Sequence, residues 1–200
     1  MRTVTSIRHI EAVVIGASTG AIAALSQLLP PLPQDFPLAI LVAVHVPADQ
    51  PHSIASLLQA KCRVRVKEAE DKEPAHSGTV YFAPPDYHLL VEDDRRLSLS
   101  NEEPVNYSRP SIDVLLESAA DVYRDSLLAV ILTGANHDGA QGARAVGRAG
   151  GTVLVQHPHS ATARMMPDAA LAACPTAEPM SLADLTDLFL SRGRGLLCRP

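Results

Sequence analysis

The sequence predicts a single domain of the α/β class, a three-layer αβα fold around a doubly wound, mainly parallel sheet. Short apolar runs that continue without alternation are typical of strands covered on both faces. These runs alternate along the chain with segments of helical spacing, the order expected of a parallel sheet with crossover helices. The chain is 46% hydrophobic but only 4% aromatic, with no Trp. The predicted core is therefore aliphatic.

The first third of the chain predicts two strand–helix units followed by a strand of a different pattern. The first apolar run stops at Gly16, and the helical spacing after it ends at Pro30. A second continuous run ends before His45, and a third segment alternates, which favours a strand near the sheet edge. The predicted elements are strands at 12–15, 38–44 and 64–67 and helices at 21–29 and about 53–60.

The middle of the chain predicts an antiparallel hairpin insertion around residues 79–100. Three short strands are separated there by turn residues at 84–86 and 93–94. A helix follows the start signal Pro110-Ser111, and two further buried strands come before and after a Gly-rich loop and its helix. The predicted elements are strands at 79–83, 88–92, 96–100, 127–132 and 152–156, helices at 111–123, from the loop 133–139 to about 150 and at 182–190, and a loose tail at 191–200.

The charge balance excludes several classes of partner. The chain has 17 Lys and Arg against 22 Asp and Glu, a formal net charge of −5, and no dense cationic block, so nucleic acid is not an expected partner. The apolar run 38–44 is far shorter than the roughly 20 residues of a membrane helix, and the N-terminus lacks the apolar core of a signal peptide. We therefore expect a cytoplasmic protein without direct membrane insertion.

Three of the predicted strands end in loops that carry a reactive or polar side chain. Ser18 lies in a Gly-x-Ser-x-Gly pattern at 16–20, between a predicted strand and a predicted helix. His45 follows the second buried run, and Asp138 lies in the Gly-rich loop 133–139. Because the carboxyl ends of parallel strands share one edge of the sheet, we expect these side chains to meet. Ser, His and Asp are the groups of a nucleophilic triad for acyl transfer.

Each of these loops also has a simpler interpretation. The loop 16–20 could bind a phosphate, with Ser18 and Thr19 as helix N-caps. His45 could be a structural or solvated histidine, and Asp138 could cap the helix that follows it. The order Ser, His, Asp along the chain differs from the Ser, Asp, His order of the α/β-hydrolases, which points away from that superfamily.

No metal or organic cofactor is expected. His157 and His159 flank a proline, and no Cys or carboxylate lies at ligand spacing beside them. A solvated loop is therefore favoured over a metal site that would also recruit His137 and Asp138. The three cysteines have no paired spacing, which argues against both a disulfide framework and a zinc site.

A series of short segments forms an ordered set of motifs from about residue 11 to 190. They are Val14 to Gly20, His45-Val46-Pro47, Val66 to Asp71, Tyr81 to His88, Pro104-Val105-Asn106, Arg109 to Leu115, the loop Leu132 to Gly139, and Met166-Pro167. In these motifs the chain resembles the catalytic domain of the bacterial chemotaxis protein-glutamate methylesterases.

The resemblance implies hydrolysis of glutamate methyl esters on the cytoplasmic helices of chemoreceptors, with release of methanol, and deamidation of receptor glutamines. Position by position, it puts the nucleophile on Ser18, the base on His45 and the orienting acid on Asp138. The residues expected in the substrate and oxyanion neighbourhood are Thr19, Gly20, Ala135 and Asn136.

The chain departs from the family pattern in two of its loops. Ala21 replaces the second Gly after Ser-Thr-Gly, and the family loop Thr-Gly-Met-Gly-Asn-Asp-Gly reads Thr-Gly-Ala-Asn-His-Asp-Gly at 133–139. Family enzymes also begin with a phosphorylatable receiver domain. We expect residues 1–200 to form one catalytic domain without a receiver domain. Regulation would then come from a separate regulatory protein, from the expression level or from neither.

Other interpretations of the function stay open. A Ser esterase or amidase could use the same triad on a different substrate, and the altered loop at 133–139 is compatible with a weakly catalytic interaction module. Arg109 is four residues from Asp113, which predicts a modest ion pair on one helix face. Because Arg109 also lies in a family motif, a role in holding the active-site loops or contacting an acidic receptor helix is a second hypothesis.

Overall fold

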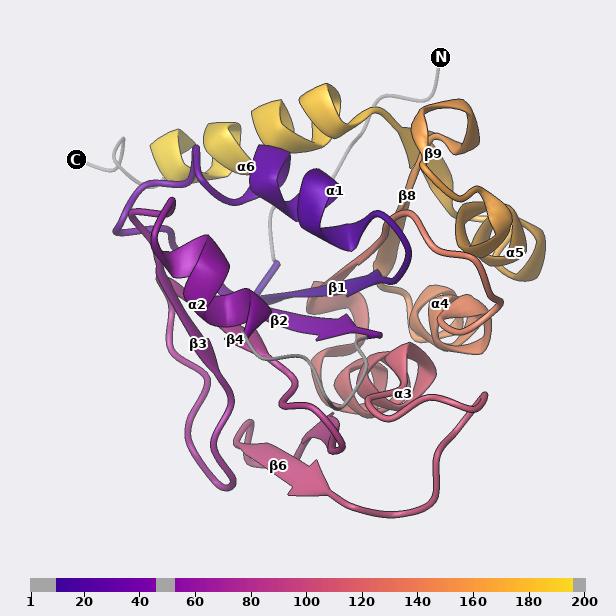
Figure 1. Cartoon of the computed structure of the whole chain (residues 1–200), viewed down its shortest axis with the longest axis horizontal. Coiled ribbons are helices and arrows are strands. Elements are labelled where there is room, and N and C mark those ends of the chain that lie inside the picture. Colours follow the sequence, from indigo (N-terminus) through magenta and orange to yellow (C-terminus); the bar gives the residue numbers. More distant parts are fainter. Residues whose placement is uncertain (1–9, 46–52, 196–200) are drawn as a thin grey trace.

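The structure is built around a seven-stranded parallel sheet with helices on both faces (Figure 1). The computed structural model describes residues 10–45 and 53–195, with side chains as far as Ser191. The strands lie in the order β3-β4-β2-β1-β7-β8-β9, and every pairing among them is parallel. They are β1 (Ala12–Ala17), β2 (Ala39–Val44), β3 (Arg65–Glu68), β4 (Thr79–Phe82), β7 (Leu127–Ile131), β8 (Thr152–Gln156) and β9 (Glu178–Met180).

Helices pack on both faces of the sheet and divide the core into two apolar clusters. One cluster contains side chains of α1 (Ala21–Leu28), α2 (Ile54–Gln59) and α6 (Leu182–Gly195). The other contains side chains of α3 (Ile112–Tyr123), α4 (Ala140–Arg148) and α5 (Met165–Ala173). Short 3-10 turns lie at Arg124–Ser126 and Pro158–Ser160. The predicted three-layer αβα fold is confirmed.

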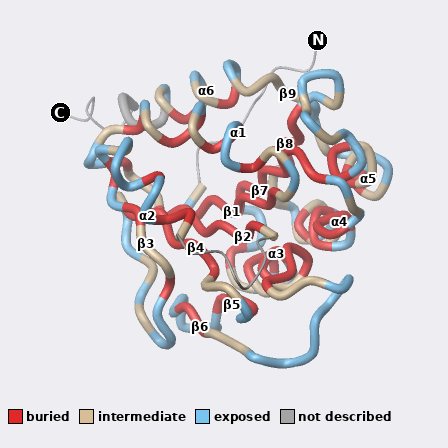
Figure 2. Tube along the Cα trace, viewed as in Figure 1, coloured by how far each residue is buried: buried red, intermediate tan, exposed pale blue. Residues whose placement is uncertain are grey.

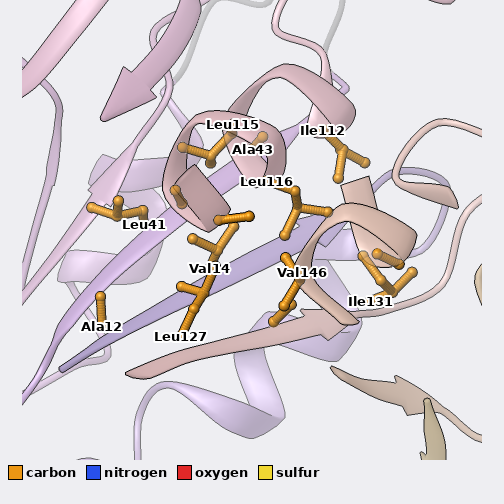
Figure 3. Packing of buried hydrophobic residues seen from close by; sticks show 14 of the residues in the cluster. Ala12, Val14, Leu41, Ala43, Ile112, Leu115, Leu116, Leu127, Ile131 and Val146 are labelled. Carbon is orange, nitrogen blue, oxygen red and sulfur yellow. The ribbon is translucent and has the colours of Figure 1, made fainter. Parts of the chain in front are cut away.

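Side chains of the central strands alternate between the two clusters. In β1, Val13 and Ile15 belong to the cluster of α1, whereas Val14 belongs to the cluster of α3, and all three are 0% exposed. Figure 3 shows Val14 beside Leu115 and Leu116 of α3, and Figure 2 shows burial following the sheet. Burial on both faces explains why these strands read as continuous aliphatic runs.

The carboxyl ends of three neighbouring strands lie together at one edge of the sheet. β1 pairs with β2 on one side, where Ala17 is opposite Val44, and with β7 on the other, where Gly16 is opposite Ile131. The chain runs from β1 to β2 and only later returns to β7, so β1 and β7 frame the topological switch point of the sheet. Ligand sites of open α/β sheets lie at this place.

The antiparallel insertion is present but smaller than predicted. β5 (His88–Val91) and β6 (Leu97–Ser100) form an antiparallel pair, whereas β4 joins the parallel sheet between β3 and β2. All three strands are short and separated by similar turn residues, so local pattern does not reveal which of them leaves the main sheet. β3 is an edge strand, as its alternating pattern predicts.

Three features near the C-terminal end were not predicted. They are helix α5, strand β9 and the continuation of α6 beyond residue 190. Both α5 and β9 contain a proline, Pro167 and Pro179, which weakens their pattern. Pro167 lies in the first turn of its helix, where proline is tolerated, and Pro179 lies on an edge strand. The prediction of a loose tail from residue 191 is wrong as far as Gly195, because α6 continues to that residue.

Some predictions fall on residues outside the described part of the chain. They concern the N-terminus up to residue 9, Val46 and Pro47 after the His45 position, and the last part of the tail with Cys198. Among the helices of the described residues, none is long and apolar enough to cross a membrane.

Candidate active site

Ser18 stands at the turn between β1 and α1. Its backbone N–H donates to the carbonyl of Thr133 at 2.9 Å, and its own carbonyl accepts from the N–H of Ala21 at 2.8 Å. Gly20 begins the helix with a positive φ of 88° and makes no side-chain cap. The interpretation of Ser18 and Thr19 as helix N-caps is therefore wrong, and the Ser18 hydroxyl is not committed to the start of α1.

His45 follows β2, directly beside Ser18. Its backbone N–H donates to the carbonyl of Ala17 at 3.2 Å, which fixes the start of the loop after β2 against the strand that leads to Ser18. Ser18 and His45 line one open cavity of about 510 Å³, together with apolar side chains that include Val44, Ile22 and Ile54. Among the described residues, no hydrogen bond joins the Ser18 side chain to His45.

The imidazole of His45 is held by Asp138. Its Nε2 lies 2.7 Å from Oδ2 of Asp138, and the two side chains are 12% and 0% exposed. Asp138 comes from the loop between β7 and α4, so the pair joins loops that follow the two strands on either side of β1. The interpretation of Asp138 as a cap of the following helix is wrong, because Gly139 is the N-cap of α4. His45 is not a solvated histidine, since its side chain is largely buried and bonded to Asp138.

Asp138 instead caps a helix that comes earlier in the chain. Both of its carboxylate oxygens accept hydrogen bonds from the N-terminal end of α3 and its approach. Besides His45, the donors are the N–H of Ile112 at 2.6 Å, the Ser111 hydroxyl at 2.8 Å, the Asn106 amide at 2.9 Å and the N–H of Asp113 at 3.1 Å. The free N–H groups and the positive end of the helix dipole both favour a carboxylate at this position.

These contacts decide the charge of the acid. Burial favours the neutral carboxyl and would raise the pKa of Asp138. The hydrogen bonds from His45, from the Ile112 N–H, from Asn106 and from the Asp113 N–H outweigh burial and hold the pKa of Asp138 at about 2. Asp138 is therefore an ionised, buried acceptor at neutral pH.

Asp113 is a second buried carboxyl in the same network. Its Oδ1 accepts the N–H of Gly142 in α4 at 2.7 Å, and its Oδ2 accepts from Nδ2 of Asn106 at 2.8 Å. Burial raises the pKa of Asp113 and the charge of Asp138 adds to that rise, while the N–H of Gly142 opposes it. Asn106 thus bridges two carboxyl groups with one amide nitrogen.

Two glycines allow α3 to approach this closely. A Cβ on Gly16 would lie 2.3 Å from Cγ2 of Ile112, and a Cβ on Gly139 would lie 2.9 Å from the same atom. Gly139 also has a φ of 94°, which favours glycine. The Ile112 side chain therefore packs between the loops of Ser18 and Asp138, and its N–H reaches Asp138.

The contacts of His45 fix its tautomer. Ionised Asp138 can only accept, so Nε2 of His45 carries the proton and Nδ1 carries the lone pair. Nδ2 of Asn136 lies 3.1 Å from this Nδ1. Nδ1 is therefore the nitrogen available to act as a base.

The other predicted neighbourhood residues are placed as follows. The carbonyl of Thr19 accepts from the Thr133 hydroxyl at 2.8 Å, and the Thr19 side chain is exposed. Gly20 lines the cavity with Ser18, whereas Ala135 is exposed. Within the described part of the chain, Asn136 is the one of these four residues whose side chain forms a hydrogen bond with His45.

Asn106 and Ser111 are functional candidates that sequence reasoning missed. The sequence marks Ser111 only as part of a helix start signal and Asn106 only as part of a motif. The N-cap preference for Ser led to Ser111, but its hydroxyl donates to Asp138 and makes no cap of its own helix. The signal for a carboxylate partner lies in the first N–H groups of α3, which have no acceptor within their own helix.

Arg109 does not pair with Asp113, so that prediction is wrong. It lies before the start of α3, and its guanidinium contacts Oδ1 of Asp86 at 2.7 and 3.0 Å. It also donates to the carbonyls of Asn101 and Glu102, each at 2.8 Å. Arg109 thus ties the loop after β4 to the segment that leads to Asn106.

The pair His157 and His159 lies in a turn beyond β8. The two rings stack with centroids 5.2 Å apart, and the N–H of His159 donates to Nδ1 of His157 at 3.4 Å. Within residues 10–45 and 53–195, no group of three or more His, Cys, Asp or Glu side chains could hold a metal ion.

Comparison with known proteins adds an independent line of observation. The model of the CheB methylesterase family matches residues 13–189. A Leptospira interrogans protein provisionally named protein-glutamate methylesterase/protein-glutamine glutaminase is 46% identical over 180 residues, which cover 90% of this chain and 93% of that protein. The protein-glutamate methylesterase/protein-glutamine glutaminase of Bordetella parapertussis is 41% identical over 184 residues, covering 90% of this chain and 52% of the relative.

A solved structure shares the fold. The crystal structure of the Thermotoga maritima CheB methylesterase catalytic domain superposes with a TM-score of 0.83 at 33% sequence identity. The match covers 91% of this chain and 98% of the Thermotoga chain.

Proposed function

Because the chain belongs to the CheB methylesterase family, we propose that it hydrolyses glutamate methyl esters on the cytoplasmic helices of chemoreceptors and releases methanol. The observation that carries this proposal is the cavity in which Ser18 lies beside a His45 bonded to ionised Asp138. Because the proposed substrate lies on cytoplasmic helices, the proposal also places the enzyme in the cytoplasm.

Ser18 is the proposed nucleophile. Its Oγ attacks the carbonyl carbon of the ester while the proton passes to Nδ1 of His45, and Asp138 stabilises the imidazolium that forms. The tetrahedral intermediate expels methoxide, which takes the proton from His45 and leaves as methanol. Water then attacks the acyl-enzyme with His45 again as base, which frees the glutamate and regenerates Ser18.

Backbone N–H groups at the start of α1 are the proposed oxyanion donors. The N–H of Ser18 already donates to the Thr133 carbonyl, and the N–H of Ala21 already donates to the Ser18 carbonyl. The proposal therefore assigns the oxyanion to the N–H groups of Thr19 and Gly20, which precede the first turn of α1 and lie where the helix dipole favours negative charge.

The shape of the cavity supports a side chain presented by a protein. Ile22, Val44 and Ile54 give it apolar walls that suit the methylenes and the methyl group of a glutamyl ester. Ile22 is also 45% exposed, so apolar surface continues out of the cavity mouth. No cofactor takes part in the proposed reaction.

The same acyl-enzyme supports deamidation of glutamine. Attack of Ser18 on a side-chain amide gives the same glutamyl ester of Ser18, with ammonia in place of methanol as the leaving group. We propose this as a second activity, because relatives in the family carry both activities in their names.

The test is methanol release from methylated receptor membranes. Ser18→Ala is expected to lower turnover by about 10³-fold or more, since the nucleophile is lost and only binding and oxyanion contacts remain. Ser191→Ala, which removes an exposed hydroxyl of α6 bonded to the Leu188 carbonyl at 2.7 Å, is the matched control with wild-type turnover.

Two outcomes would replace the proposal. Hydrolysis of generic esters without action on receptors would indicate a Ser esterase or amidase with another substrate. Failure of a fluorophosphonate to label wild-type Ser18 would indicate an interaction module without esterase activity.

A further inference from the structure

We propose that Asn136 is a positioning residue that acts through His45, because in the free enzyme its amide occupies the ring nitrogen that must take the Ser18 proton. The inference rests on the proposed function, in which Ser18 is the nucleophile. Its central observation is the distance of 3.1 Å between Nδ2 of Asn136 and Nδ1 of His45.

The orientation of the Asn136 amide is set by the backbone. The N–H of Asp138 lies 3.2 Å from Oδ1 of Asn136, and a backbone N–H can only donate. The oxygen of the amide must therefore face Asp138, which leaves the NH₂ group facing His45. A flipped amide would break this contact and place an oxygen against the lone pair of Nδ1.

The Asn136 amide and the Ser18 hydroxyl compete for one acceptor. Neutral imidazole has a single lone pair on Nδ1, directed in the plane of the ring. Asp138 fixes the other nitrogen as the N–H, so the ring has no second acceptor to offer. Ser18 can pass its proton to His45 only where the Asn136 N–H has given up this lone pair.

Proton transfer makes the conflict stronger. Once Nδ1 is protonated, its N–H points at the NH₂ group of Asn136, and two donors face each other. The amide must then turn away for the imidazolium to persist. Asn136 has room to do so, because it is only partly buried and its chain neighbours Ala135 and His137 are exposed.

The consequence is a site whose base is engaged until substrate arrives. The Asn136 amide must turn away from His45 before Nδ1 is free for the Ser18 hydroxyl. Without substrate, the reactivity of Ser18 is held below the value that the His45 and Asp138 pair alone would give.

The test measures the rate at which a fluorophosphonate modifies Ser18 in the full chain, where Oγ bonds to phosphorus and fluoride leaves. Asn136→Ala frees Nδ1 and is expected to raise this rate about two- to tenfold, the effect of one net neutral hydrogen bond. Asn136→Asp keeps an oxygen for the Asp138 N–H but presents a carboxylate to Nδ1, which favours the imidazolium and lowers the rate.

The opposite signs separate this role from packing. A residue that only fills space would not speed labelling in Asn136→Ala and would leave it unchanged in Asn136→Asp, whose side chain has nearly the same shape. The ¹⁵N signal of His45 Nδ1 gives a second readout, since it should shift toward a free lone pair in Asn136→Ala and toward a protonated nitrogen in Asn136→Asp. His137→Ala, an exposed change in the same loop, is the control with wild-type rate and spectrum.

An unchanged or lower labelling rate in Asn136→Ala overturns the inference, as does a rate in Asn136→Asp that is equal to or above that of the wild type. Failure of the wild type to be labelled at all would instead count against Ser18 as the nucleophile, and so against the proposed function. Melting temperatures of the variants show whether each compared chain is folded.

Discussion

Asp138 and Ser18, the proposed acid and the proposed nucleophile, are held in very different ways. Asp138 is fully buried and accepts five hydrogen bonds, two of them from backbone N–H groups of α3. Ser18 is partly exposed at the edge of an open cavity, and within the described residues its hydroxyl shares no hydrogen bond with His45.

This difference follows from what each group does in the proposed reaction. A carboxylate that stabilises a developing charge is most effective when its donors are fixed in advance and water is excluded. A nucleophile must instead pass between hydroxyl, tetrahedral and acyl states, and catalytic hydrogen bonds in free enzymes are often formed only with substrate. The site combines a rigid acid with an adjustable nucleophile.

The strongest test of the rigid side is Asp138→Asn. An amide has only one oxygen and cannot accept from all five donors. Its NH₂ group would either face another N–H group or donate to Nε2 of His45, which would put the imidazole proton on Nδ1, the wrong tautomer. We expect methanol release to fall about 10³- to 10⁴-fold, as measured by initial rates on methylated receptors. A loss of less than tenfold would mean that the acid does not prepare the base, and the comparison between the two sides would fail.

The pH dependence of stability tests the charge on the rigid side. The pKa of Asp138 is about 2 in the folded chain against an ordinary 3.8. A lowered folded pKa contributes stability above pH 3.8 that is lost as the pH falls toward 2, about 2 kcal/mol in all. The unfolding free energy of the wild type, measured by urea titration, should therefore drop more between pH 4 and pH 2 than that of Asp138→Asn.

Asp113 contributes with the opposite sign. Its pKa is raised by burial and by the charge of Asp138, so its protonation on acidification favours the folded chain and begins at higher pH. Asp113→Asn should remove this gain in stability, so that the loss of unfolding free energy caused by protonation of Asp138 is easier to measure. An identical pH profile in wild type and Asp138→Asn would show that Asp138 has no lowered pKa.

The smallest effect is expected from Arg109→Ala, which weakens the outer support of the rigid side. The ion pair of Arg109 with Asp86 is partly exposed, with side chains 21% and 61% exposed, so its loss should lower the unfolding free energy by about 1 kcal/mol or less. Methanol release should fall by less than about fivefold. Cleavage of the segment 101–108 by a protease should become faster.

Arg164→Ala is the control for this change. It removes a surface ion pair with Asp168 on α5, away from the segment that Arg109 holds. Equal protease sensitivity of the two variants would remove the proposed role of Arg109 in holding that segment.

The sequence predicted the central sheet and the three catalytic candidates for the same physical reason. Strands buried on both faces appear as aliphatic runs, and the residue after each run falls at the carboxyl edge of the sheet. Ser18, His45 and Asp138 were found in this way, and the structure brings all three to one edge. Their catalytic roles stay predictions.

The supporting contacts could not be predicted because they join segments that are distant in sequence. Asp138 caps α3 rather than the next helix, so local capping rules assigned it to the wrong helix. The i, i+4 spacing of Arg109 and Asp113 failed because the helix begins only at Ile112. The change of a family Gly to Asn136 was visible in the sequence, but its contact with His45 required the position of the ring.

The backbone donors of α3 make the acid resistant to mutation. Two of the groups that hold Asp138 are the N–H groups of Ile112 and Asp113, and a peptide N–H survives every side-chain replacement except proline. Sequence drift at these two positions can alter the packing of the helix, but it cannot delete those bonds. The charge state of Asp138 is thus encoded partly in the main chain, where most point mutations do not reach.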